Sequence, residues 1–271
     1  MFRALVLGAV QGLTEFVPVS SSGHLVLVPF LLGWQIPALG FDVAVHLGTA
    51  LAIVVYFRRE IAGIVSGTVR TVFRRGREAD RAHVRMAGLL LVGSVPAAVA
   101  GLTLESTFER LFSEPPTVAL FLAVTAAMLF VAERLYARRP PARARDISRV
   151  GWKDAVTMGV FQAVAIAPGI SRSGATISAG LTRGLTRDAS ARFSFLLGLP
   201  AILGAGLLKM GDLTEGVDAA TVAGATAVSA VTGFAAITLL LRYLRVRDTR
   251  PFAWYCLLFG AVSLGYWLQV S

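Results

Sequence analysis

The sequence has little charge and almost no cysteine. Charged residues make up 15% of its 271 residues, whereas a soluble domain of this length carries about a quarter. The single cysteine, Cys256, excludes a disulfide framework and a metal site built from several cysteines. Lysine is also scarce, because only Lys153 and Lys209 interrupt a set of basic residues that is otherwise all arginine. Together these absences exclude most classes of soluble protein.

Long apolar runs take the place of the missing charge. Hydrophobic residues make up 55% of the chain, and the mean hydropathy is +0.69. An apolar helix of about 20 residues crosses the hydrocarbon of a bilayer. The sequence therefore predicts an all-α polytopic membrane protein, with residues 1–271 as one membrane domain. The six predicted spans are Leu39 to Phe57, Met86 to Leu104, Thr117 to Ala132, Phe193 to Leu208, Ala219 to Leu241 and Phe252 to Val270.

Two further stretches, Phe2 to Leu32 and Trp152 to Leu181, are apolar at their ends but polar and Pro-broken in the middle. A broken helix is tolerated in a membrane where it lines a cavity in the protein. We therefore predict that each stretch is a re-entrant helix pair that enters and leaves on one side. The polar interruptions of the first stretch also argue against a cleavable signal peptide.

The arginines predict the orientation, because short cytoplasmic loops collect basic residues. Arg58 to Arg85 holds eight arginines, Arg134 to Lys153 holds seven basic residues and Arg242 to Arg250 holds four. A fourth group consists of Arg183, Arg187 and Arg192. All four blocks are predicted to be cytoplasmic. This distribution explains the net charge of +10 without a nucleic-acid partner, and we expect none.

The predicted topology is an inverted repeat. Residues 1–133 and 152–271 are each one re-entrant pair followed by three transmembrane helices, inserted in opposite senses, and residues 134–151 form a basic cytoplasmic linker. The two broken stretches also echo each other, since Gln11 precedes Pro18 and Gly23 much as Gln162 precedes Pro168 and Gly174. Inverted repeats place their broken helices face to face near the midplane of the bilayer.

The polar residues of these stretches are the candidate site. Gln11 and Glu15 are four positions apart and share one face of a helix that Pro18 then ends or kinks. Serine hydroxyls and His24 follow at the break. In the second stretch, the Ser171-Arg172-Ser173 run offers hydroxyls, free N–H groups and a guanidinium at a helix start, which suits a phosphate.

Each residue also has a structural reading. Single serines and threonines in membrane helices often serve only in packing, whereas ionisable groups such as Glu15 and Arg172 are costly at membrane depth and usually functional. We expect His46 to be a hydrogen-bonded packing residue within its span, and His83 to be exposed in a basic loop.

The strings QGLTEFVPVSSSGHL and PGISRSGATI resemble the two signature regions of the BacA-type undecaprenyl-diphosphate phosphatases, which are linked to bacitracin resistance. The resemblance extends to FDVAVHLGTALA and ASARFSFLLGLPAILGA. It implies hydrolysis of undecaprenyl diphosphate to undecaprenyl phosphate and inorganic phosphate, which recycles the lipid carrier for peptidoglycan synthesis. The first motif of the family is Glu or Gln, three residues, then Glu, and this chain has the Gln form at Gln11. A Gln cannot act as a base, so that task falls to Glu15.

The resemblance also implies roles for the site residues. Ser21 is the candidate nucleophile or positioning hydroxyl, His24 its acid/base partner, and Arg172 the group that neutralises the phosphoryl charge. Glu15 would activate or orient, or hold a divalent ion. The residues expected to bind substrate are Gln11, Ser20, Ser22, Ser171, Ser173 and Thr176.

The remaining expectations concern surroundings and partners. We expect no tightly bound cofactor, and a divalent cation, Mg²⁺ or Ca²⁺, would arrive with the diphosphate. The protein would lie in the inner membrane of a bacterium, with its site open to the periplasmic face. Small residues between Gly224 and Gly233 suggest a homodimer. The alternative function is a flippase for the lipid carrier, since inverted repeats are also the plan of transporters.

Overall fold

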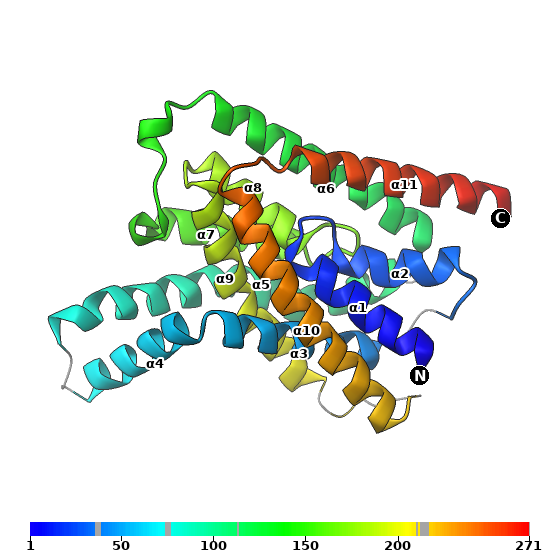
Figure 1. Ribbon diagram of the computed structural model, residues 1–271, viewed down its shortest axis with the longest axis horizontal. Coiled ribbons are helices and arrows are strands. Elements are labelled where there is room, and N and C mark those ends of the chain that lie inside the picture. Colours follow the sequence, from blue (N-terminus) through cyan, green and yellow to red (C-terminus); the bar gives the residue numbers. More distant parts are fainter. Residues whose placement is uncertain (36–38, 74–76, 113, 210, 212–216, 271) are drawn as a thin grey trace.

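The computed structural model describes all of residues 1–271 except 36–38, 74–76, 113, 210, 212–216 and 271 (Figure 1). In the described part of the chain the fold is built from α-helices and short 3₁₀ turns, without a β-sheet. The helices are α1 (Phe2–Phe16), α2 (Ser21–Leu31), α3 (Leu39–Tyr56), α4 (Arg58–Val72), α5 (Arg81–Phe112), α6 (Pro115–Ala137), α7 (Trp152–Val164), α8 (Arg172–Thr182), α9 (Arg187–Leu208), α10 (Ala219–Leu244) and α11 (Arg250–Val270).

Six of these helices are long and apolar enough to cross a membrane, namely α3, α5, α6, α9, α10 and α11. They coincide with the six predicted spans, which confirms a helical membrane protein. The predicted bounds are wrong at α5 and α9, because both helices start several residues earlier, at Arg81 and Arg187. Arginine has a high helix propensity, so a span can continue as helix beyond its apolar part.

The stretch from Arg58 to Arg85, expected to be a loop, contains α4. Ile61, Ile64 and Val65 lie along one side of this helix, at spacings of three to four residues that are typical of an amphipathic helix. Together with the start of α5 it projects from the left side of the molecule in Figure 1.

The four arginine blocks meet at one end of the molecule. The side chain of Glu133, near the end of α6, accepts hydrogen bonds from Arg187 at the start of α9 and from Thr249 just before α11. Arg192 of α9 pairs with Glu60 at the start of α4, with 2.7 Å between Nη2 and Oε1. Ion pairs therefore join segments from distant parts of the sequence into one basic end.

The helix pairs α1–α2 and α7–α8 each begin and end at a common end of the molecule. The guanidinium of Arg3 lies over the ring of Trp34, 5.5 Å from its centroid, so the start of α1 is close to the end of α2. In the second pair, Arg183 Nε lies 3.0 Å from Asp154 Oδ1, which joins the end of α8 to the start of α7. The first pair closes beside the start of α10, where Thr221 bonds to Met1, and the second closes at the basic end.

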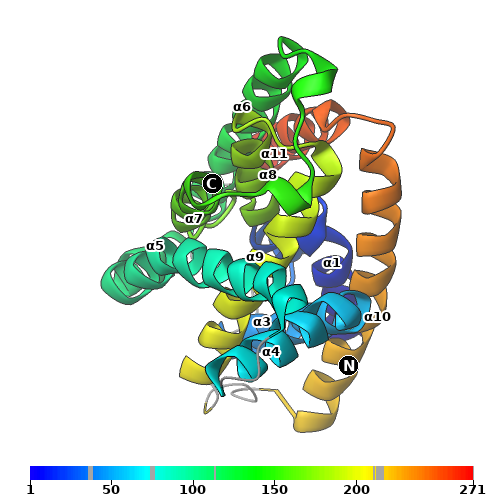
Figure 2. The same ribbon diagram turned by 90° about the vertical axis from the view of Figure 1, so that its left-hand side faces the viewer.

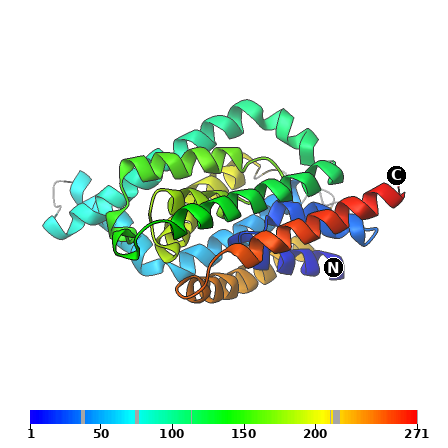
Figure 3. The ribbon, with the colours of Figure 1, turned by 90° about the horizontal axis from the view of Figure 1, so that it is seen from above.

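Each helix pair packs against a span from the other half of the chain. Helix α1 packs along α10, as Figure 2 shows, and α7 packs along α5. Both contacts are so close that an added Cβ would overlap the facing backbone, at Gly8 against Ala225 and at Gly159 against Gly93. Gly8 precedes Gln11 by three residues, as Gly159 precedes Gln162. In the same way α6 and α11 lie side by side (Figure 3).

The small-residue face of α10 is buried within the chain. Ser229 and Gly233 contact α1 and α3, where Gly12, Gly48 and Phe16 are their neighbours. The central apolar core, which includes Phe16, continues between α3, α9 and α10. This face of α10 is therefore not available to a second copy of the chain, and it gives the predicted homodimer no support.

Candidate active site

The helices α2 and α8 begin in the same way. Each has a serine at its N-cap, Ser20 or Ser171, whose hydroxyl accepts a hydrogen bond from the backbone N–H three residues later, at Gly23 or Gly174. Such a cap satisfies one of the N–H groups that a helix start leaves unpaired. Each cap hydroxyl also bonds to the serine two positions on. Ser22 and Ser173 are those partners, so the sequence echo corresponds to two equivalent helix starts.

The two helix starts face each other across the halves of the chain. Arg172 Nη2 donates to Glu15 Oε1 at 2.7 Å, and the hydroxyl of Ser173 donates to the carbonyl oxygen of Val17 at 3.2 Å. Side chains of the spans α6 and α11 bond to the backbone of the segments that join α1 to α2 and α7 to α8. Thr125 of α6 bonds to the backbone of Gly169 and Ser171, and Cys256 of α11 bonds to the carbonyl of Pro18.

Glu15 is the centre of the site, and both of its carboxylate oxygens are engaged. Oε2 accepts from Ser21 Oγ at 2.5 Å and from Gln11 Nε2 at 3.0 Å, while Oε1 accepts from Arg172. The carboxylate side chain is only 4% exposed. A buried carboxylate in protein needs such charged and hydrogen-bonding partners. The structure therefore brings Glu15, Ser21, Arg172 and Gln11 together, although they come from both halves of the chain.

Arg172 reaches Glu15 through a space that Gly198 of α9 leaves open. A Cβ atom at Gly198 would overlap the guanidinium. Nη1 of the same guanidinium lies 3.4 Å from the carbonyl oxygen of Ser194, also on α9. The backbone of α9 thus fixes the direction in which Arg172 points.

The imidazole of His24 bonds to Ser20 and Tyr255. Its Nδ1 is 2.7 Å from the carbonyl oxygen of Ser20, and its Nε2 is 2.7 Å from the hydroxyl of Tyr255 on α11. A carbonyl only accepts, so Nδ1 carries the hydrogen and Nε2 of a neutral ring accepts from Tyr255. The ring also stacks on Phe259 at 4.6 Å. The expected pairing of His24 with Ser21 is not seen.

The other predicted hydroxyls hold the local structure. Thr176 Oγ1 lies 2.6 Å from Ser194 Oγ and donates to the carbonyl of Arg172, so its hydroxyl links α8 to α9. Ser171 and Ser173 are both 1% exposed. Ser22 is half-buried and contacts Ser20.

A residue that the sequence reasoning missed, His46 of α3, comes to the site. Its Nε2 lies 3.4 Å from Glu15 Oε2. The expected hydrogen bond of a packing residue is also present, from Nδ1 to the carbonyl oxygen of Asp42 at 2.7 Å. The only signal in the sequence was an ionisable residue within a span, since nothing in the pattern reveals that α3 packs against α1.

The site does not fit a resident divalent cation. Within the described residues, no three His, Cys, Asp or Glu side chains come together as a metal site. Glu15 already uses both oxygens for Arg172, Ser21 and Gln11. A cation bound to Glu15 would compete with these partners and would lie beside the guanidinium of Arg172.

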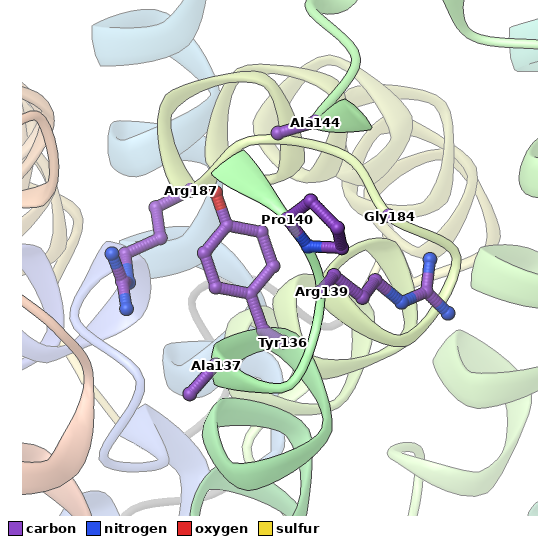
Figure 4. Close-up of a pocket in the computed structure, with 7 residues that line it drawn as sticks. All are labelled: Tyr136, Ala137, Arg139, Pro140, Ala144, Gly184 and Arg187. Carbon is purple, nitrogen blue, oxygen red and sulfur yellow. The ribbon is translucent and has the colours of Figure 1, made fainter. Parts of the chain in front are cut away.

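Two surface recesses lie at the basic end, away from Glu15. One of about 240 Å³ is lined by Tyr136, Arg139 and Arg187, among others, and Figure 4 shows their side chains around it. The other, of about 340 Å³, shares Arg187 and reaches Tyr243 and Arg247. Neither recess contains a predicted site residue.

The chain matches the family model described as bacitracin resistance protein BacA over residues 4–262. It is 45% identical over 271 residues to the undecaprenyl-diphosphatase of Geobacter sulfurreducens, with 98% of each chain covered. It is 44% identical over 265 residues to the undecaprenyl-diphosphatase of Pelobacter propionicus, with 96% of this chain and 94% of the other covered. Undecaprenyl-diphosphatase 2 of Streptomyces coelicolor is 38% identical over 272 residues, with 97% and 93% covered. The matches include both helix starts that form the site.

Proposed function

Because the chain belongs to the BacA family of bacitracin resistance proteins, we propose that it is an undecaprenyl-diphosphatase that acts through Ser21, Glu15 and Arg172. It hydrolyses undecaprenyl diphosphate to undecaprenyl phosphate and inorganic phosphate. This reaction returns the lipid carrier to peptidoglycan synthesis and confers resistance to bacitracin. The observation that carries the assignment of residues is the carboxylate of Glu15, which binds the hydroxyl of Ser21 on one oxygen and the guanidinium of Arg172 on the other.

Ser21 is the nucleophile in this proposal. Its Oγ, 2.5 Å from Glu15 Oε2, attacks the terminal phosphorus and gives its proton to that carboxylate. The bond from phosphorus to the bridging oxygen breaks, and its electron pair leaves with undecaprenyl phosphate. Water then hydrolyses the phosphoserine and releases inorganic phosphate. Trapping a phosphorylated Ser21 in an acid-quenched reaction distinguishes this route from direct attack by water.

Arg172 binds the oxygens of the terminal phosphoryl group and neutralises the charge that develops on them. Its planar guanidinium can form two parallel hydrogen bonds to a phosphate. The starts of α2 and α8 also supply backbone N–H groups and the positive end of the helix dipole, which suit a phosphate. Gln11, Ser22 and Ser173 line the position of the diphosphate in this proposal. His24 orients the start of α2 through its bond to Ser20.

The site belongs to an inverted repeat of residues 1–133 and 152–271, with the segment 134–151 as the linker. Three observations support the inverted repeat. Each helix pair closes at its own end of the molecule, through Arg3 and Trp34 or through Asp154 and Arg183. The two pairs pack on corresponding spans of the opposite half, and their breaks meet at Glu15 and Arg172. In a bilayer, each pair is then re-entrant.

The basic end is cytoplasmic in this proposal, because arginine blocks remain inside. The site opens to the periplasmic face. His46, whose side chain is 26% exposed, lies in the half of α3 that is farther from the basic end. Arg172 is 16% exposed, so these two side chains mark the way to water. A divalent cation, Mg²⁺ or Ca²⁺, accompanies the diphosphate as part of the substrate.

Release of inorganic phosphate from undecaprenyl diphosphate by the purified protein in detergent tests the function. A detergent micelle has no two sides, so a flippase gives no signal in this assay. Wild type should release phosphate, and Ser21→Ala should not. If wild type releases none but moves the lipid across sealed vesicles, the packing of an inverted repeat serves transport, and the flippase reading is right.

A further inference from the structure

His46 touches the centre of the site but has no task in the reaction described above. Its Nε2 lies 3.4 Å from Glu15 Oε2. The same carboxylate oxygen accepts the hydrogen bond from Ser21 Oγ. The hydroxyl of Ser21 and Nε2 of His46 therefore both lie close to one carboxylate oxygen, Oε2 of Glu15.

The hydrogen bonds of His46 define which of its nitrogens carries a hydrogen. Nδ1 lies 2.7 Å from the carbonyl oxygen of Asp42. A carbonyl oxygen only accepts, so Nδ1 is the donor. In the neutral ring, Nε2 then has a lone pair that faces Glu15.

Exposure distinguishes the two groups. The side chain of Glu15 is 4% exposed, whereas that of His46 is 26% exposed. Glu15 is therefore enclosed by protein, whereas part of the His46 side chain is open at the surface of the protein. An imidazole is ordinarily a stronger base than a carboxylate, so a neutral imidazole beside a protonated carboxyl group can accept its proton.

We propose that His46 takes, through Glu15, the proton that leaves Ser21, and passes it to water. This inference rests on the proposed function. The Oγ–H bond of Ser21 breaks as Oγ bonds to phosphorus, and the proton goes to Glu15 Oε2. The bridging oxygen keeps the electron pair of the broken P–O bond. The proton then moves from Oε2 to the lone pair of His46 Nε2, and the imidazolium releases it to water. Glu15 is thereby a carboxylate again for the second step.

The groups around His46 fit this task. The ionisable side chains that face it in the described part of the chain are Glu15 and, one turn earlier on its own helix, Asp42. Asp42 Oδ1 is buried and has no hydrogen-bond partner among the described residues. Arg172 lies on the far side of Glu15. Helix α10 presents only hydroxyls here, those of Thr226 and Ser229, and both bond to carbonyls of α3.

The test compares His46→Gln with wild type in the phosphate-release assay across about pH 5 to 8.5, the range in which histidines change charge. Gln keeps a hydrogen-bonding side chain but cannot take a proton. We expect kcat to fall about 10- to 100-fold, with KM little changed. In wild type, activity should fall at acid pH, because a protonated His46 cannot accept a further proton. In the variant this fall should be absent, so its lower activity should persist to lower pH. His83→Gln is the matched control and should keep both the rate and the pH profile. His83 was expected in an exposed loop, but it lies half-buried at the start of α5, against Gly63 of α4.

A second variant guards against misfolding. Added imidazole should restore turnover to His46→Ala, because the position is partly exposed, and should not restore it to Glu15→Ala. Wild-type kcat and an unchanged acid limb in His46→Gln would overturn the inference and leave the proposed function intact. Loss of an alkaline limb would also overturn it, since His46 would then act as a cation. Absence of phosphate release from wild type would instead overturn the proposed function.

Discussion

Ser21 and Arg172 occupy the same position in two equivalent helix starts, and they bind the two oxygens of one carboxylate. Each follows the N-cap serine of its helix, Ser20 or Ser171. Ser21 donates to Oε2 of Glu15 and Arg172 donates to Oε1. Equivalent positions after the two capping serines thus supply a hydroxyl in one half of the chain and a cation in the other, although φ is +69° at Ser20 and −69° at Ser171. The residues that follow Gly23 and Gly174 also differ between the halves, since one is His24 and the other is Ala175.

Replacement of Glu15 by Gln tests the carboxylate. Glu15→Gln keeps the shape but removes the charge and the base, and its amide nitrogen cannot accept the hydrogen bonds that one carboxylate oxygen accepts. Turnover should fall by about two to four orders of magnitude, measured as phosphate release by the purified variant. Gln11→Ala, one helical turn away, should cost much less. Full activity in Glu15→Gln, together with loss of activity in Gln11→Ala, would show that Glu15 is not the base.

Replacement of Gly198 by Ala tests the position of Arg172 without changing a charged residue. The added methyl group overlaps the guanidinium, so the side chain has to leave Glu15. We expect turnover to fall at least tenfold, since a misplaced group of about 1 Å can cost a factor of 100. Gly204→Ala on the same helix meets no atom within 4 Å and should behave as wild type.

Arg172→Lys separates the shape of the cation from its charge. Lys is a point charge that cannot reproduce two parallel hydrogen bonds to a phosphate. The Lys variant should therefore recover little of the turnover that Arg172→Ala loses. Near-wild-type phosphate release by Arg172→Lys would reduce Arg172 to a balancing charge for Glu15.

Cysteine labelling tests the orientation. In a Cys256→Ala background, Arg77→Cys should react with a membrane-impermeant maleimide only after the cytoplasmic side is opened. Glu114→Cys should react in intact cells that have a permeable outer membrane. The reverse pattern would contradict the orientation predicted from the arginines.

The buried pair of Glu133 and Arg187 should stabilise the basic end. Glu133 is fully buried and also accepts from the backbone N–H and the hydroxyl of Thr249. Glu133→Ala leaves Arg187 and Thr249 without their acceptor, so the free energy of unfolding should fall by about 3–5 kcal/mol. Thermal unfolding in detergent measures the loss. Glu60→Ala removes a more exposed pair, with Arg192, and should cost about 1 kcal/mol or less.

Acid should weaken the junction between α4 and α5. The pKa of Asp80 lies far below its usual value, because the Arg70 side chain and the backbone N–H of Arg77 donate hydrogen bonds to its carboxylate. A lowered pKa contributes stability that is present above the unfolded pKa of about 4 and is lost as the pH falls below it. The difference in melting temperature between wild type and Asp80→Asn should therefore shrink from pH 7 to about pH 3. Glu78→Gln, at an exposed side chain, is the control and should show no such difference at either pH.

The membrane helices and the broken stretches could be predicted because their signals are local. An apolar run such as Ala219 to Leu241 is visible without knowledge of its neighbours, and it corresponds to α10. Pro18 and Pro168 mark the breaks for the same reason. The meeting of Glu15 and Arg172 could be anticipated from the cost of ionisable groups in a membrane, which favours a partner of opposite charge.

The remaining features depend on tertiary packing that a single sequence does not encode in readable form. His24 is engaged by Tyr255, which is 231 positions away, and no local pattern joins the two. His46 reaches Glu15 only because α3 packs against α1. The role of Gly198 follows from the path of one guanidinium. Helix α4 is a different case, because the apolar spacing of its residues was present in the sequence but was outweighed by the arginines around it.

The ion pair between Arg172 and Glu15 also has a consequence for how tightly the products are held. Any phosphate that binds Arg172 has to compete with a carboxylate of the protein itself, which lies 2.7 Å from the guanidinium. A diphosphate carries more negative charge than inorganic phosphate, so it competes better with Glu15 for the guanidinium. The internal carboxylate has to be displaced by either ligand, so it lowers the affinity for both, and the less charged inorganic phosphate is left as the weaker ligand. In the proposed reaction, the inorganic phosphate that is formed is therefore held weakly at Arg172, so Glu15 also acts as the group that displaces the product.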